Sequence, residues 1–115
     1  MRRNKEDSHT LIPPGTLYML ILKTLARLGP MHGYGIAQYI QQTSEEVLQV
    51  EEGTLYPALQ RMLIKGWVKD VWEQTENSRR ARYYHLTPQG RKQLSAEISD
   101  YQRIIEAISR IVLTT

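Results

Sequence analysis

Apolar side chains recur every three or four residues near the C-terminal end of the chain, as on one face of a helix. Thr87 and Pro88 precede this stretch, and they suit an N-cap followed by proline at the first helical position. The pattern predicts a final helix from Pro88 to about Leu113, about 39 Å long at 1.5 Å per residue. Its apolar stripe consists of Leu94, Ile98, Tyr101, Ile105, Ile108 and Val112, with Ile104 and Ile111 beside it.

Two shorter helices are predicted near the start of the chain. The first extends over about 16–28, where Thr16 is a suitable N-cap and Gly29-Pro30 ends the periodicity. Its apolar positions form a broad stripe, so we expect it to be covered on more than one side. The second is expected over about 34–42, after a turn that His32 caps or hydrogen-bonds.

A third helix is predicted from about Gly53-Thr54 to Gly66, a residue that suits a C-terminal cap. Pro57 has no backbone N–H, so the helix is expected to begin just before it. On a helical wheel, the face expected in the core consists of Leu55, Leu59, Met62 and Leu63. The opposite face consists of Gly53, Thr54, Pro57, Gln60, Arg61 and Ile64, with Tyr56 at the border.

Three segments rich in β-branched and aromatic residues predict strands. Val47–Val50 is a short one, while Trp67–Gln74 and Arg82–Leu86 suit a hairpin joined by the polar link 75–81. The order helix, helix, short strand, helix, hairpin is that of a winged helix. In that fold the third helix can enter the DNA major groove, and the hairpin is the wing.

The predicted fold class is therefore α+β, mainly α: a winged helix-turn-helix with a two-stranded β wing and a long C-terminal dimerisation helix. A length of 115 residues suits one small domain. We expect a disordered arm over 1–10, the DNA-binding part over 11–87 and the dimerisation helix over 88–115. Because so small a domain cannot cover the whole final helix, its stripe predicts a homodimer. The alternative is that it folds back on the first helix.

Charge is unevenly distributed along the chain. Lys and Arg number 15 against 12 Asp and Glu, a formal net charge of +3. Acidic residues gather in the middle of the chain, at Glu45, Glu46, Glu51 and Glu52. The segment 77–92 holds no acid and five cations, which are Arg79, Arg80, Arg82, Arg91 and Lys92. Such a cluster suits phosphate binding, with a solvated surface as the alternative.

The candidate DNA contacts follow from these two elements. On the third helix, Thr54 and Gln60 can hydrogen-bond to bases or phosphates, and Arg61 can pair with either. Tyr56 can donate its hydroxyl to a phosphate or serve as a core aromatic residue with a solvated tip. The predicted contacts on the wing are Arg79, Arg80 and Arg82. The alternative is that these arginines only keep the tip of the hairpin soluble.

Four short motifs carry a resemblance to a known family. They are HGYGI at 32–36, EGTLYPAL at 52–59, GWV at 66–68 and RARYYHLTPQG at 80–90. In this order and spacing they resemble the PadR family of bacterial transcriptional regulators, over about 11–94. The resemblance implies a repressor of the subgroup with one short C-terminal dimerisation helix, bound as a homodimer to inverted-repeat double-stranded DNA.

The same resemblance places DNA contacts at Thr54, Tyr56 and the wing arginines, and the dimer on the stripe of the last helix. Some family members bind effectors near the dimer interface. A small aromatic or hydrophobic effector is therefore an open alternative for this chain, where Tyr101 is the one aromatic residue of that helix.

The sequence lacks the groupings typical of catalysis or metal binding. His9, His32 and His85 fall in different predicted elements, and there is no cysteine. No P-loop, dinucleotide-binding loop or nucleophile elbow is present. We therefore expect that the protein is not an enzyme and has no metal or cofactor. A second hypothesis for its function is a winged-helix protein-interaction module without specific DNA binding. Without a membrane-spanning run or an apolar stretch behind the charged start, we expect a soluble intracellular protein. The resemblance implies a bacterial protein of the cytoplasm and nucleoid.

Overall fold

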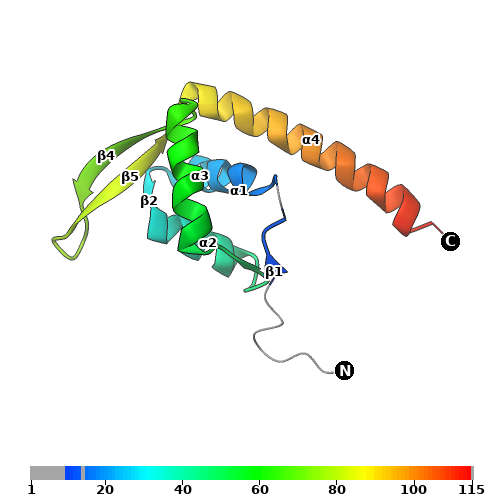
Figure 1. Ribbon diagram of the computed structural model, residues 1–115, viewed down its shortest axis with the longest axis horizontal. Coiled ribbons are helices and arrows are strands. Elements are labelled where there is room, and N and C mark those ends of the chain that lie inside the picture. Colours follow the sequence, from blue (N-terminus) through cyan, green and yellow to red (C-terminus); the bar gives the residue numbers. More distant parts are fainter. Residues whose placement is uncertain (1–9, 14, 115) are drawn as a thin grey trace.

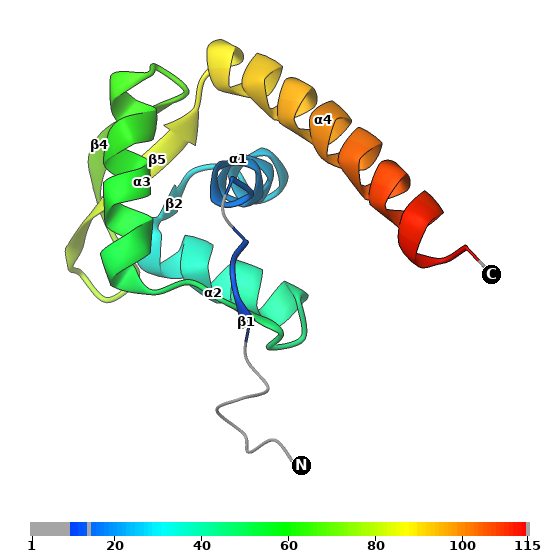
Figure 2. The same ribbon diagram turned by 45° about the vertical axis from the view of Figure 1, so that its right-hand side comes forward.

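Three helices pack around one core beside a small sheet, and a fourth, long helix extends from them (Figures 1 and 2). The computed structural model describes residues 10–13 and 15–114. The helices are α1 (Leu17–Leu28), α2 (Gly33–Thr43), α3 (Glu52–Ile64) and α4 (Pro88–Val112). The strands are β1 (Thr10–Leu11), β2 (Met31–His32), β3 (Leu48–Gln49), β4 (Val68–Gln74) and β5 (Arg80–Leu86). This order confirms the predicted fold class.

The core lies where α1, α2 and α3 meet the base of the wing. Its buried apolar residues are Ile21, Leu22, Leu25, Ile36, Ile40, Leu55, Ala58, Leu59, Met62, Val68, Tyr84 and Leu94. On α3 the buried positions follow the predicted apolar face, and Leu63 packs partly buried beside them. The opposite face of α3 is exposed as predicted, so the core fixes which side of this helix is available to a partner.

The wing is the β4–β5 hairpin, and it is joined by a third strand that the sequence did not predict. β4 and β5 pair antiparallel from Val68 opposite Leu86 to Gln74 opposite Arg80, so β5 begins two residues earlier than expected. β2 pairs with the other edge of β5 through Met31 opposite Tyr84. A two-residue strand carries too little periodicity to be recognised from sequence.

Side chains cap two of the helices as predicted. The His32 Nδ1 atom accepts a hydrogen bond from the Gly35 N–H at 2.9 Å at the start of α2. The Thr87 hydroxyl accepts one from the Gly90 N–H at 2.9 Å at the start of α4. Thr16 occupies the N-cap position of α1, but its hydroxyl donates to the Pro13 carbonyl instead of capping the helix.

The helix α3 begins at Glu52, one residue before the predicted start at Gly53-Thr54, and Pro57 lies within its first two turns as expected. The missing Pro57 N–H costs the helix one hydrogen bond, to the carbonyl of Gly53. Gly53 is exposed, and water can replace that donor. At the other end, Gly66 has the positive φ of 77° expected of a C-terminal glycine, and its N–H donates to the Leu63 carbonyl.

The helix α4 is covered by its own chain only along its first turns. Leu94 belongs to the core and Ile98 packs against it, so the alternative of folding back on α1 holds for these two positions. Further along, Tyr101, Ile105, Ile108 and Val112 are exposed. Figures 1 and 2 show this end of α4 projecting away from the other helices.

The predicted arm over 1–10 lies outside the described residues except for Thr10. β1 pairs in parallel with β3, with Thr10 opposite Leu48 and Leu11 opposite Gln49. The backbone leading into α1 is therefore attached to the backbone leading into α3.

Candidate nucleic-acid interface

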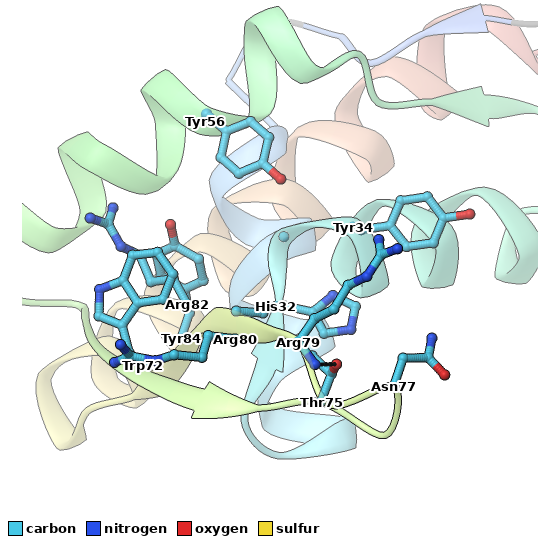
Figure 3. A pocket seen from close by; sticks show the side chains of 12 residues that line it. His32, Tyr34, Tyr56, Trp72, Thr75, Asn77, Arg79, Arg80, Arg82 and Tyr84 are labelled. Atoms are coloured by element: carbon cyan, nitrogen blue, oxygen red, sulfur yellow. Dashed lines mark hydrogen bonds between the residues drawn. The ribbon is translucent and has the colours of Figure 1, made fainter.

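A groove of about 730 Å³ lies between α3, the start of α2 and the wing. Figure 3 shows Tyr56 reaching from α3 toward the hairpin, while Trp72, Arg80 and Arg82 stand on the hairpin wall. The start of α2 contributes His32, Gly33 and Tyr34 to the lining, and Arg79 lies near the hairpin tip. Aromatic and cationic side chains from three separate elements thus line one open surface.

The hairpin wall is built by the alternation of strand side chains. In the β4–β5 register Trp72 stands directly opposite Arg82, so these two side chains lie on the same face of the hairpin, with Arg80 two residues along. The guanidinium carbons of Arg80 and Arg82 each lie 5.6 Å from the centre of the Trp72 ring. Cation–π contact at this distance holds both arginines on the groove face.

The sequence did not single out Trp72 as a functional residue. Its neighbourhood with the two arginines depends on the pairing register of the hairpin, which a sequence alone does not give. Over half of the Trp72 side chain is exposed, at 54%, which is unusual for a tryptophan in a small protein.

An acidic residue also lies on the groove face. Asp70 Oδ2 lies 3.1 Å from Arg82 Nε, in an ion pair without good hydrogen-bond alignment. Tyr84, and to a smaller extent Asp70, stabilise the guanidinium and raise the pKa of Arg82 above its usual value. Arg82 is therefore a permanent cation whose charge is partly offset by Asp70.

On the opposite wall, the Tyr56 ring rests against the backbone of Gly33. A Cβ atom placed on Gly33 would lie 2.8 Å from Tyr56 Cε1, closer than a side chain tolerates. Partial burial, followed by the charge of Glu52 and by Tyr84, raises the pKa of Tyr56. Its hydroxyl is thus kept protonated and can donate a hydrogen bond to an anion.

Gly33→Ala is expected to displace the Tyr56 ring and weaken DNA binding about tenfold, the order expected when one hydrogen bond to a charged group is lost. The ring can rotate toward solvent, so the thermal unfolding midpoint should change little. Titration of the Gly33→Ala variant and of the unmodified protein with duplex DNA checks this. In a Tyr56→Ala background Gly33→Ala should have no further effect, and an unchanged loss there would mean that the glycine acts by another route.

The remaining candidates on α3 lie outside the groove lining. Thr54, Gln60 and Arg61 are exposed on the outer face of the helix. Arg61 Nε donates a hydrogen bond to the Tyr18 hydroxyl of α1 at 2.5 Å, and its guanidinium carbon lies 5.7 Å from the centre of that ring. The sequence did not predict the contact with Tyr18, because it joins residues 43 positions apart.

Both the sequence and the fold of this chain are similar to those of known proteins. A model of the transcriptional regulator PadR-like family matches residues 21–96. The chain belongs to this family. A transcriptional regulator from Clostridium thermocellum is 28% identical, with a TM-score of 0.78 over 85% of this chain and 94% of that one. A PadR family transcription regulator from Clostridium difficile is 30% identical, with a TM-score of 0.71 over 87% of this chain and 100% of that one.

A longer relative is also similar to this PadR-like chain. A 37.1 kDa protein in transposon TN4556 of Streptomyces fradiae is 38% identical over 75% of this chain. The chain spans only 23% of the length of that relative.

Within the described part of this PadR-like chain, a second apolar surface lies on α4. A pocket of about 460 Å³ between α1 and α4 is lined by Tyr18, Met19, Tyr101, Ile104 and Ile105, among others.

No helix in the described residues is long and apolar enough to cross a membrane. Among the same residues, no three His, Asp or Glu side chains are grouped so that they could hold a metal ion.

Proposed function

We propose that this PadR-like chain is a sequence-specific DNA-binding transcriptional regulator that acts as a homodimeric repressor. The observation that carries the proposal is the groove in which Arg80 and Arg82, held on Trp72, face Tyr56 of the exposed helix α3. Cationic and hydroxyl donors on two walls suit a sugar–phosphate strand passing between them. The proposed role involves no catalytic step, and it implies a protein of the bacterial cytoplasm.

In the proposed complex, α3 enters the major groove and the wing contacts the adjacent backbone. The exposed face of α3 offers Thr54, Gln60 and Arg61 to base edges or phosphates, because its opposite face is fixed in the core. The wing arginines supply sequence-independent attraction. Recognition of the operator sequence therefore depends on α3, and the strength of attachment depends largely on the wing.

The exposed end of α4 supports the dimer. Tyr101, Ile105, Ile108 and Val112 present apolar surface that a second copy of the chain would bury, while Leu94 and Ile98 anchor the helix to its own core. Two copies related by a two-fold axis would read an inverted repeat with half-sites about 10 bp apart or a multiple of that spacing. A small aromatic or hydrophobic effector would find room in the pocket between α1 and α4.

Selection from a random duplex library tests the proposal. We expect enrichment of an inverted repeat that binds at least about 10³-fold more tightly than nonspecific DNA. Failure to enrich any sequence, together with binding that disappears at moderate salt, would contradict specific recognition.

Replacing Arg80 and Arg82 together by alanine tests the part assigned to the wing. We expect weaker binding to all sequences and a plot of log affinity against log salt that is shallower by about 1.8, or 0.9 for each lost phosphate contact. Lys23→Ala with Arg27→Ala removes the same charge from exposed positions on α1 outside the groove and is the matched control. Equal slopes for the two double variants would remove the wing from the DNA interface.

A protein-interaction module remains the second candidate function. The side chain of Ile64 is 78% exposed at the end of α3, where it could contact an apolar partner. Glu51 and Glu52 at the start of the same helix would oppose phosphates. Salt-insensitive or absent DNA binding in the titrations above would favour this function.

A further inference from the structure

The contact between Tyr18 and Arg61 joins α1 to the exposed face of α3. Both the hydrogen bond of 2.5 Å and the placement of the guanidinium carbon 5.7 Å from the ring centre fix the arginine against one side chain. Tyr18 is itself held in place, because its ring lies edge-on to Trp67 with the two centroids 5.4 Å apart. Tyr18 is partly buried against the core, whereas Arg61 is exposed.

The atom used in this contact leaves the rest of the guanidinium free. Arginine has five N–H donors, of which Nε provides one and the two Nη groups provide four. Because Tyr18 takes the Nε–H, the edge formed by both Nη groups remains available for two parallel hydrogen bonds. That edge matches paired acceptors, such as O6 and N7 of guanine or two oxygens of a phosphate.

A free arginine side chain loses considerable conformational entropy when it is ordered at an interface. A side chain already held by a neighbour loses less on binding. We propose that Tyr18 is a positioning residue that orders Arg61 on α3 for a bidentate contact with DNA. This inference rests on the proposed function, and it adds a residue of α1 to the DNA-reading machinery.

The test is Tyr18→Phe, measured on the operator found by selection. The variant removes one hydroxyl and keeps the ring that packs on Trp67, so the thermal unfolding midpoint should change little. We expect operator affinity to fall about two- to tenfold, the range expected when one long side chain must be ordered on binding. Tyr39→Phe, which removes a hydroxyl from a half-buried tyrosine of α2 outside the groove lining, is the matched control and should leave operator affinity unchanged.

A double-mutant cycle separates positioning from a general effect on the fold. Arg61→Ala should weaken operator binding about tenfold or more, as expected for loss of a bidentate pair. In the Arg61→Ala background, Tyr18→Phe should cause no further loss. Equal losses in both backgrounds would overturn the inference, because Tyr18 would then act independently of Arg61.

The same variants distinguish the two sources of the acceptor pair. If Arg61 reads a guanine, Tyr18→Phe and Arg61→Ala both relax the preference at one position of each half-site. If it binds a phosphate, Arg61→Ala instead lowers the salt slope by about 0.9. Operator binding that is unaffected by Arg61→Ala would overturn the positioning role and leave the proposed function standing. Absence of any operator for the unmodified protein would overturn both.

Discussion

Ile105→Asp is expected to convert the protein to a monomer and to lower operator affinity by about 100-fold or more. The Ile105 side chain is 40% exposed on the free part of α4, in the centre of the apolar surface that we assign to the dimer. A carboxylate buried there without a partner would be strongly unfavourable. Since two linked reading heads bind much more tightly than one, loss of the dimer removes this advantage at the operator.

Sedimentation equilibrium and operator titration check this prediction together. Ser99→Asp introduces the same charge at an exposed position on the other side of α4 and should preserve both the dimer and operator affinity. A dimer that persists with Ile105→Asp would move the interface away from this face of the helix. Loss of the dimer without loss of operator affinity would mean that one protomer suffices for recognition.

Gly90→Ala is expected to lower the free energy of unfolding by on the order of 3 kcal/mol, because the added methyl group has no room. A Cβ atom at Gly90 would collide with the Trp67 carbonyl oxygen and would lie 2.8 Å from Leu86 Cδ1. The Trp67 carbonyl cannot move freely, since it accepts hydrogen bonds from both the N–H and the hydroxyl of Thr87. This contact attaches the first turn of α4 to the base of the wing.

Urea unfolding followed by circular dichroism measures that loss. Gly53→Ala is the control, because a Cβ atom at this exposed position on α3 would meet nothing within 4 Å. Gly53 lies in the first turn of α3, where alanine is at least as good a helix former as glycine, so Gly53→Ala should not destabilise the fold. Equal stability of Gly90→Ala and the unmodified protein would show that α4 can shift away from Trp67 without cost.

The sequence predicts those parts of this fold that depend on local periodicity. The stripe of α4, the apolar face of α3 and the caps at His32 and Thr87 all follow from residues within a few positions of one another. By contrast, the sequence does not show which positions of the α4 stripe are buried in the core of the chain and which stay exposed. Leu94 and Val112 belong to the same periodic stripe, and only packing against the rest of the chain distinguishes the buried position from the exposed one.

The candidate site shows the same limit. Arginines near a hairpin tip can be recognised from sequence, and they do line the groove. The neighbours that orient them cannot be recognised, because Trp72 reaches Arg82 through strand register and Tyr18 reaches Arg61 through the packing of two helices. Contacts between segments distant in sequence carry no local pattern, so they have to be taken from the structure.

The short strand β2 links the two walls of the groove within one chain. It pairs with β5 of the wing and continues directly into α2, whose first residues form part of the facing wall. The separation of wing and helices is thereby set by backbone hydrogen bonds inside one chain. In the dimer that we propose, adjustment to operators of different half-site spacing would then depend on the contact between the two copies, because the distance between wing and helices is fixed within each copy.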